Sequence, residues 1–209
     1  MSIDGKKVIE VLEKINVKME ENKAYLSELD AAIGDGDHGL NMCKGFKAVV
    51  EKLKEDDGQD IAGILKKTGM ALVTNVGGAS GPLYGTAFMK AAGCVSGKTE
   101  IDINDFGEML YYALEGIKMR GRSEAEDKTM IDALEPALKA VREGISKELE
   151  AKEVLRLAKE AAFKGVEHTK DIIAKKGRAS YLGLRSIGHQ DAGATSSAIM
   201  LETIYQAFN

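Results

Sequence analysis

The sequence has few of the residues on which all-β folds depend. Aromatic residues make up only 5% of the 209 residues, tryptophan is absent, and proline occurs twice, at positions 82 and 136. β-Sandwiches and β-barrels are usually richer in aromatic and β-branched residues. The plentiful Ala, Leu, Glu, Lys and Met favour helices instead. The composition therefore predicts an all-α protein.

Cysteines, excess basic charge and long apolar runs are also scarce. Cys43 and Cys94 form no CxxC pair or zinc-type spacing, so we expect free thiols in a reducing cytosol. The net charge of −4 argues against nucleic-acid binding, which needs a basic face. No run reaches the roughly 18 apolar residues of a membrane span. Residues 1–7 lead into a polar helix rather than a signal-peptide core. We expect a cytoplasmic protein that binds neither nucleic acid nor membrane.

Apolar residues recur at three- and four-residue steps along most of the chain, as on the buried face of an amphipathic helix. This pattern predicts a single domain, residues 1–209, of about eight antiparallel up-down helices. Asn22 and Asp60 are expected N-caps, and Asn104 or Asp105 is expected to cap a later helix. The helices are expected at 3–32 with one break, 39–53, 61–75, 82–92, 106–119, 129–141, 151–175 and 194–208.

Three carboxylates, Asp30, Asp35 and Asp37, fall within eight residues, and glycines separate them. Acidic side chains this close repel one another unless a cation lies between them. Asp30 is expected on a last helical turn and the other two in the loop beyond it, so all three can converge. Hard oxygen ligands suit Mg²⁺ or Ca²⁺ rather than a soft metal. The stretch therefore predicts a cation site.

Other chemistries fit this chain less well. An EF-hand starting at Asp35 would need a bidentate Glu at position 46, where the chain has Phe46. The three histidines are scattered and form no HExxH zinc motif. Ser80, His189 and Asp191 could supply a hydrolase triad, but no GxSxG motif is present. Mg²⁺ with a nucleotide fits best, because Mg²⁺ usually binds a few carboxylates plus substrate phosphates.

A second stretch, residues 75–86, is rich in small residues and precedes a helix with Pro82 in its first turn. Such a loop can offer backbone N–H groups to phosphate, although a close crossing of two helices would also need small residues. Residues 92–99 resemble a Walker A loop. They follow a predicted helix rather than a strand, so we interpret their glycines as helix ends.

Two further loops could complete a site. The charged loop 120–130 is either a mobile linker or part of that site, and loop 177–193 is long enough to be functional or disordered. Its Tyr, Leu and Ile residues argue for order. Arg178 could contact phosphate, and Leu83 and Met130 could sandwich an adenine. The loops near residues 34 and 76 are expected at the same end of the helix array.

Four motifs in this order resemble the nucleotide-binding L subunit of dihydroxyacetone kinase. They are Gly34-Asp-Gly-Asp-His-Gly39, Gly77-Gly-Ala-Ser-Gly-Pro-Leu83, Asp127-Lys-Thr-Met-Ile-Asp132, and Gly177-Arg-Ala-Ser-Tyr-Leu-Gly183 with Gly188-His-Gln-Asp191. The resemblance covers roughly residues 1–209. It implies a barrel of eight antiparallel helices with the nucleotide across one mouth.

The resemblance also implies roles for individual residues. Asp30, Asp35 and Asp37 match ligands of two Mg²⁺ ions bound to ADP. Two positions depart from the family pattern, since Leu184 stands where Glu is common and Ala192 where Pro is usual. The positions that match nucleotide contacts are His38, Asn41, Ala79, Ser80, Gly121, Met130, Arg178, Asp191 and Gly193.

The function implied is that of a phosphotransferase subunit in phosphoenolpyruvate-dependent dihydroxyacetone kinase. In similar subunits, a phosphohistidine on an M-type partner of the phosphotransferase system phosphorylates bound ADP. The phosphoryl group then passes to dihydroxyacetone on a separate K subunit, and the nucleotide stays bound as a coenzyme. Two alternatives remain open. One is a kinase subunit that binds and releases free ATP, as an ordinary kinase does, and that serves the phosphorylation of another ketose or polyol. The other is a regulatory module that binds nucleotide or a transcription factor without turnover.

Overall fold

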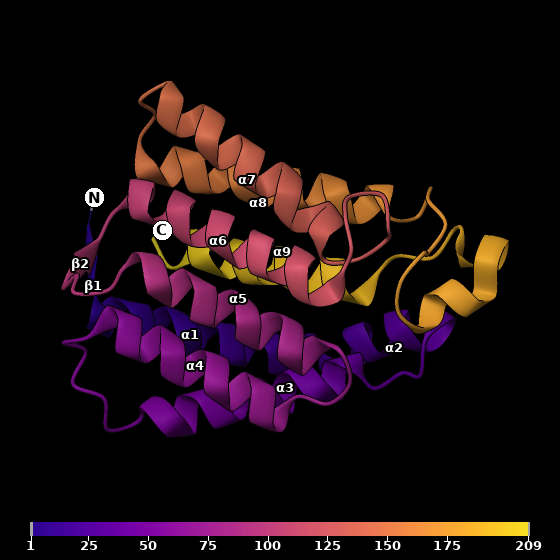
Figure 1. Ribbon diagram of the computed structural model, residues 1–209, viewed down its shortest axis with the longest axis horizontal. Helices are drawn as coiled ribbons and strands as arrows, with labels where there is room; N and C mark the ends of the chain where they lie inside the picture. The colour runs from indigo at the N-terminus through magenta and orange to yellow at the C-terminus, as the bar shows by residue number, and fades with distance from the viewer. Residues whose placement is uncertain (1, 209) are drawn as a thin grey trace.

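Helices make up nearly all the regular structure of the computed structural model, which describes residues 2–208. The predicted all-α class is confirmed (Figure 1). A 3₁₀ helix, η1, spans Arg178–Ser186. Two short strands are β1 (Ile3–Asp4) and β2 (Glu100–Ile101). The α-helices are α1 (Gly5–Glu21), α2 (Lys23–Ile33), α3 (His38–Leu53), α4 (Ile61–Asn75), α5 (Ser80–Cys94), α6 (Ile103–Gly121), α7 (Ile131–Ser146), α8 (Ala151–His168) and α9 (Ala192–Gln206).

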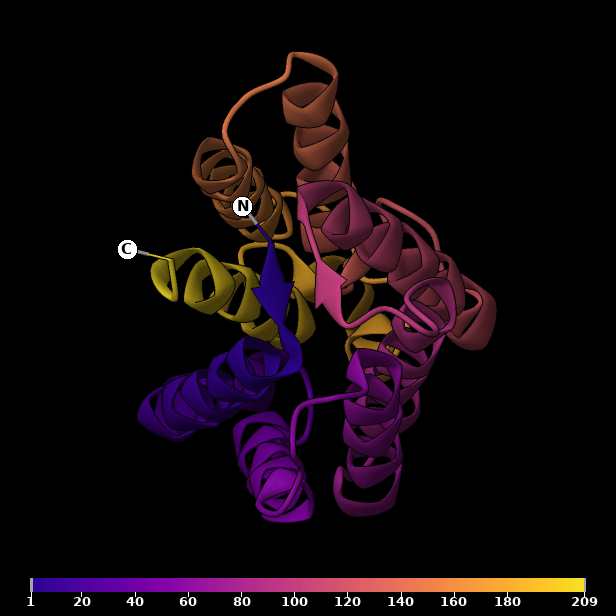
Figure 2. The same cartoon turned by 90° about the vertical axis from the view of Figure 1, so that its left-hand side faces the viewer.

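The long helices pack in the order in which they follow one another. From α3 to α9 each helix contacts its successor, α1 contacts α3, and α9 returns to contact α1 (Figure 2). α2 continues beyond α1 and packs on α3 and η1. The predicted apolar stripes face inward and form the core. Its largest fully buried apolar side chains include Met19, Phe46, Ile64, Leu114 and Ile131.

The two ends of this helix array differ. At one end β1 and β2 pair antiparallel, with Ile3 opposite Ile101, and both ends of the chain lie there (Figure 1). The loops 34–37, 76–79, 122–130 and 177–191 gather at the other end. Helices that alternate in direction bring alternate connections to the same end, which places the sequence-predicted site loops together.

Two glycines allow α4 and α5 to cross closely. A Cβ at Gly69 would lie 2.8 Å from the carbonyl oxygen of Gly85, and a Cβ at Gly85 would lie 2.8 Å from that of Gly69. Real side chains do not tolerate such distances, so only glycine lets the two backbones approach this far. The helix-crossing interpretation of residues 75–86 is therefore correct for Gly85.

The cap predictions had mixed outcomes. Asp60 caps α4 as predicted, because its side chain accepts from the N–H of Gly63 at 2.9 Å. The prediction of Asn104 or Asp105 as the cap of α6 was wrong. Asp102 caps this helix, and Asp105 closes a reciprocal capping box with it. Asn22 forms no side-chain N-cap, since its Nδ2 donates back to the carbonyl oxygen of Lys18 in α1.

The predicted helix 151–175 is too long, because α8 ends at His168 and Ile173 is 38% exposed. Its apolar spacing continues, but the carbonyl oxygens of Thr169 and Ile172 bind the ammonium of Lys128. Loop 177–193 contains η1, but its apolar residues do not account for this structure, because Tyr181 is 87% exposed and Leu184 is 73% exposed. The last helix begins two residues earlier than predicted, because Asp191 caps it.

Several predicted absences can be compared with the structure. Residues 92–99 end α5 and lead into β2, so they do not form the strand–loop–helix of a P-loop. Cys43 and Cys94 are free. Within residues 2–208, no helix has the length and apolar character to cross a membrane.

Candidate functional site

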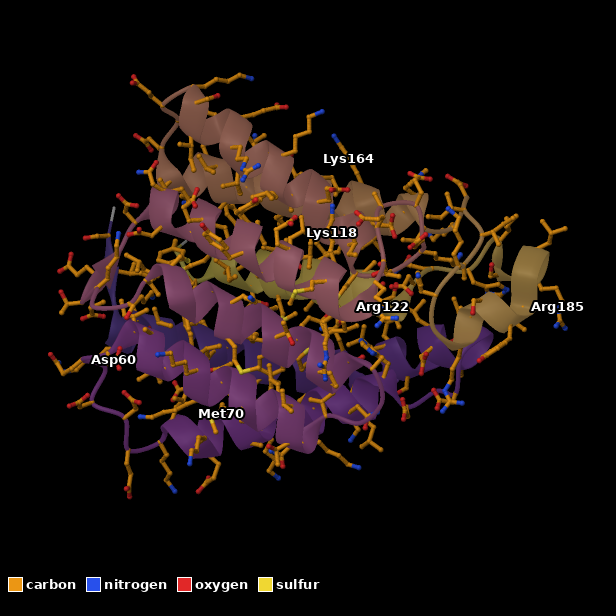
Figure 3. All side chains as sticks on the ribbon, viewed as in Figure 1. Asp60, Met70, Lys118, Arg122, Lys164 and Arg185 are labelled. Carbon is orange, nitrogen blue, oxygen red and sulfur yellow. The ribbon has the colours of Figure 1, made fainter. Side chains whose placement is uncertain are left out.

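A cavity of about 620 Å³ opens between the four loops that gather at one end of the helix array. The ends of α2 and α6 and the starts of α3, α5 and α9 line it, together with residues 77–79, 128–130 and 176–179 of the loops. In Figure 3, Arg185 projects from η1 at this end, whereas Asp60 lies at the opposite end of the long axis. Clefts of this size are typical of small-molecule sites.

The three aspartates converge as predicted. One carboxylate oxygen from each of Asp30, Asp35 and Asp37 lies within 4.8 Å of the others. Asp30 is fixed in place, because its Oδ2 accepts from the backbone N–H groups of Asp37 at 2.9 Å and His38 at 3.2 Å. This set consists only of hard oxygen donors and is partly open to the cavity. The donor chemistry fits Mg²⁺, which keeps waters and phosphate oxygens as its other ligands.

Arg178 reaches the same cluster from the far side of the cavity. Its Nη2 lies 2.8 Å from Oδ2 of Asp35, and its side chain is 70% exposed. A guanidinium at this position supplies positive charge beside the carboxylates and can also face a phosphate. Loop 177–193 therefore meets the acidic loop at the cavity.

A buried chain of hydrogen bonds connects the acidic loop to two helices. Ser80 Oγ lies 3.2 Å from Nδ1 of His38, and the other ring nitrogen lies 2.8 Å from Ser196 Oγ. Tyr84 OH lies 2.7 Å from Ser196 Oγ and 2.8 Å from Ser197 Oγ. Burial lowers the pKa of His38 and so favours its neutral ring. This series of hydrogen bonds fixes the Ser80 hydroxyl at the edge of the cavity.

The N-terminus of α5 faces the cavity without a side-chain cap. Ala79 occupies the N-cap position and accepts no N–H group through its side chain. Gly78 has a φ of +64° and nothing within 4 Å of the position of a Cβ, so its surface is open. Free N–H groups at a helix start attract phosphate. The small-residue stretch thus combines the two predicted features: Gly85 allows the close crossing of α4 and α5, and Gly78 lies at the open surface of the cavity.

Asp191 lies at the start of α9, opposite the acidic cluster. Its Oδ2 accepts from the N–H of Ala194 at 2.7 Å. Burial raises the pKa of Asp191 to about 7, more than the Ala194 hydrogen bond lowers it. The neighbouring Gly193 also lines the cavity, and its carbonyl oxygen accepts from Tyr84 OH at 3.2 Å.

The apolar side of the cavity contains Leu83, Met130 and Gly121, which form a surface suited to a flat ring. Asn41 differs from the other predicted contact residues. It is buried beneath Gly77, whose Cβ would lie 3.0 Å from Asn41 Oδ1, and it is not part of the cavity lining. Its role as a nucleotide contact stays a prediction.

Sequence reasoning missed three polar residues around this cavity. Tyr84 and Ser196 belong to the hydrogen-bonded chain of His38, and Lys128 is buried behind the loop that carries Met130. Each has hydrogen-bond partners that lie more than 40 positions away in the sequence. No local spacing signals such contacts, and the only available signal was that Lys128 lies in a motif bounded by Asp127 and Asp132.

Comparisons with known proteins agree with this geometry. The family model of the DAK2 domain matches residues 32–206. The chain is 42% identical over 206 residues to a Listeria innocua protein named PEP-dependent dihydroxyacetone kinase 1, ADP-binding subunit DhaL, covering 99% of this chain and 98% of that protein. It is 41% identical to the Escherichia coli protein named PEP-dependent dihydroxyacetone kinase, ADP-binding subunit DhaL, covering 98% and 97%.

A solved structure shares the fold. The dihydroxyacetone kinase of C. freundii superposes with a TM-score of 0.74 at 25% identity, covering 95% of this chain but only 34% of that longer one. The same kinase in complex with AMP-PNP and Mg²⁺ superposes equally well, at 23% identity. The family match and the near-full-length relatives lead to one conclusion: the chain belongs to the DAK2 domain family and, within it, to the DhaL group of dihydroxyacetone kinase subunits.

Proposed function

We propose that this chain is the ADP- and ATP-binding subunit of a phosphoenolpyruvate-dependent dihydroxyacetone kinase. The observation that carries this proposal is the convergence of Asp30, Asp35 and Asp37 within 4.8 Å beside the uncapped start of α5. Hard anionic ligands on one side and free N–H groups on the other suit a magnesium-bound diphosphate. The names of the near-full-length relatives support the same function.

In this proposal the three aspartates hold two Mg²⁺ ions, which neutralise adjacent phosphates and so lower the charge that phosphoryl transfer must overcome. Ala79 and Ser80 present the start of α5 to the phosphates, and His38 orients the Ser80 hydroxyl. Arg178 adds a cation at the open side. No side chain is needed as a general base at this point, because positioning and charge account for most of phosphoryl-transfer catalysis.

The base is proposed to lie between Leu83 and Met130, near Gly121, with Asp191 and Gly193 along the nucleotide. The packing order from α1 through α9 and back to α1 supports an eight-helix barrel with this cavity at its mouth. Such a mouth exposes the terminal phosphate toward solvent, where a partner protein can reach it.

The proposed partners are a phosphohistidine donor of the M type and a K subunit that holds dihydroxyacetone. A phosphoryl group leaves the donor histidine as its P–N bond breaks, and a P–O bond forms at the β-phosphate of ADP. The P–O bond between the β-phosphate and the γ-phosphoryl group then breaks as a P–O bond forms to a hydroxyl oxygen of dihydroxyacetone; ADP is regenerated, and the hydroxyl proton passes to solvent. A transcriptional regulator is a further proposed partner, and the cytoplasm is the proposed location.

The identity of the ligand that co-purifies with the chain tests this function. Mass spectrometry after gel filtration is expected to find about one adenine nucleotide per chain, as a resident coenzyme requires. A protein that is empty, but that turns over free ATP with a K subunit, would indicate an ordinary kinase subunit instead. A protein that neither retains nor binds magnesium–ADP in calorimetry would refute the proposal.

A further inference from the structure

Lys128 is almost completely buried, although its side chain carries an ammonium group. Only 1% of its surface is exposed, which places it among the largest fully buried residues of the part of the chain that the structure describes. Its backbone adopts a φ of +61°, which is uncommon for a lysine. A buried charge needs compensating contacts.

Three backbone carbonyl oxygens surround Nζ of Lys128. Those of Thr169 and Ser186 lie at 2.6 Å each, and that of Ile172 lies at 3.3 Å. An ammonium group has three hydrogens to donate, so these carbonyls use all of them. Two of the carbonyls follow the C-terminus of α8, where unpaired carbonyl oxygens carry partial negative charge. Lys128 thus acts as a tethered cation inside a carbonyl cage.

The charge of this ammonium is balanced by the cage and by more distant acids. Burial lowers the pKa of Lys128, while Asp191, Asp132 and Asp171 act in the opposite direction. None of these carboxylates forms an ion pair with Nζ among the described residues. The lysine is therefore held by backbone groups, whose positions depend on how the chain folds rather than on a particular side chain.

The cage joins two segments that both contribute residues to the cavity lining. Lys128 precedes Met130, on the apolar side, whereas its acceptors Thr169 and Ser186 bracket the segment that contains Arg178. The hydroxyl of Thr169 also accepts from the backbone N–H of Asp191 at 3.0 Å. One ammonium group thus connects the base side of the cavity to the segment that reaches the acidic cluster.

Each of the two joined segments is also held by hydrogen bonds of its own. Asp132 accepts from the backbone N–H groups of Glu126 at 2.6 Å and Thr129 at 2.7 Å, which closes the loop around Lys128. Ser186 Oγ accepts from the N–H of Ala174 at 2.9 Å and donates to the carbonyl oxygen of Gly183 at 2.7 Å. Lys128 holds these two segments, the Met130 loop and residues 169–186, at a fixed distance from each other.

We propose that Lys128 is a positioning residue of the nucleotide site, which sets the base pocket by holding the Met130 loop against the segment 169–186. This inference rests on the proposed function. Lys128 lines the cavity, but its three donors already point to carbonyl oxygens, so it does not serve as a phosphate ligand. Its loss disturbs recognition of the adenosine part and leaves the aspartate cluster on α2 and the following loop in place.

The test compares two ligands on the full chain. Calorimetry measures the affinity of wild type and Lys128→Met for magnesium–ADP and for magnesium–pyrophosphate, which lacks the adenosine part. We expect ADP affinity to fall about tenfold, roughly the effect of one charge-assisted hydrogen bond, while pyrophosphate affinity changes less than about twofold. A general loss of folded protein lowers the number of binding sites but not the ratio of the two affinities. Lys164→Met is the control, because this lysine projects from α8 into solvent (Figure 3).

Each outcome decides the matter. Unchanged ADP affinity in a folded Lys128→Met protein overturns the proposal, and so does an equal loss for both ligands, because the effect would then not be selective for the adenosine part. If Lys128→Met does not fold, Ser186→Ala decides, since it loosens the same anchor while keeping the carbonyl. A smaller loss that is selective for ADP supports the proposal, with exposed Ser146→Ala as its control, and no selective loss overturns it. A wild-type protein that binds neither ligand refutes the proposed function itself.

Discussion

Arg178 and Asp35 form an ion pair across the mouth of the cavity, with Nη2 of the arginine 2.8 Å from Oδ2 of the aspartate. The two residues are far apart in the sequence, and they join η1 to the loop between α2 and α3. An exposed pair of this kind contributes little to stability. Its importance is local, because it places a guanidinium beside the carboxylates that are proposed to hold magnesium.

Replacing Arg178 with glutamine is expected to weaken ADP binding in the presence of magnesium by about tenfold or more, because charge-assisted hydrogen bonds to phosphate are lost. Binding of Mg²⁺ alone should not weaken, since the substitution removes a positive charge next to its ligands. Calorimetry with each ligand measures both effects. Equal ADP affinity in the variant would show that Arg178 does not contact the nucleotide.

Replacing Asp35 or Asp37 with asparagine is expected to lower magnesium–ADP affinity at least about tenfold, because each variant removes one anionic ligand from the cluster. The helical circular dichroism signal should remain, since both side chains lie in an exposed loop. Asp57→Asn is a suitable control, because Asp57 is exposed in the loop before α4, at the other end of the molecule. Undiminished affinity in both site variants would refute the metal assignment.

The raised pKa of Asp191 predicts a pH dependence of stability. The folded state keeps the proton up to about pH 7, whereas the unfolded chain loses it near 3.8, the ordinary pKa of an aspartate. The contribution of this group is therefore fully present at low pH and is lost as pH rises toward and through 7. Asp191→Asn should remove that part of the dependence, and its amide oxygen can still cap α9.

Denaturant unfolding of wild type and Asp191→Asn between pH 4 and pH 8 measures this effect as the difference between their unfolding free energies. The variant should gain stability relative to wild type as pH rises across that interval. A constant difference would mean that burial does not shift the titration of Asp191.

The close crossing of α4 and α5 predicts different costs for two alanine substitutions in one helix. Gly85→Ala places a Cβ 2.3 Å from Cγ2 of Val73 and should cost about 1–3 kcal/mol through overpacking. Gly93→Ala places a Cβ in open space and should be neutral or stabilise the helix by up to about 1 kcal/mol. Thermal unfolding of both variants measures the difference, and similar melting temperatures would contradict the close crossing.

Features that depend on local pattern could be predicted from the sequence. The apolar spacing indicated the helices, Asp60 was identified as a cap, and glycine-separated aspartates indicated converging carboxylates. The end of α8 could not be predicted in this way. Its apolar spacing continues to Ile173, whereas the residues past His168 leave the helix and present the carbonyl oxygens of Thr169 and Ile172 to Lys128, which lies far earlier in the sequence.

The polar interior was equally inaccessible to sequence reasoning. Tyr84 and Ser196 meet His38 only because α5, α9 and the start of α3 come together at one end of the array. Asn41 is expected to contact the nucleotide, and this stays a prediction, because the structure places it beneath Gly77 rather than in the cavity lining. A motif identifies which residues a site needs, whereas their depth depends on packing against distant segments.

The placement of both chain ends beside β1 and β2, away from the cavity, has a practical consequence (Figure 1). A tether attached at either end, such as an affinity tag on a sensor surface, holds the molecule with its mouth turned toward the solution. Immobilised protein should therefore report ligand and partner binding without steric interference from the support.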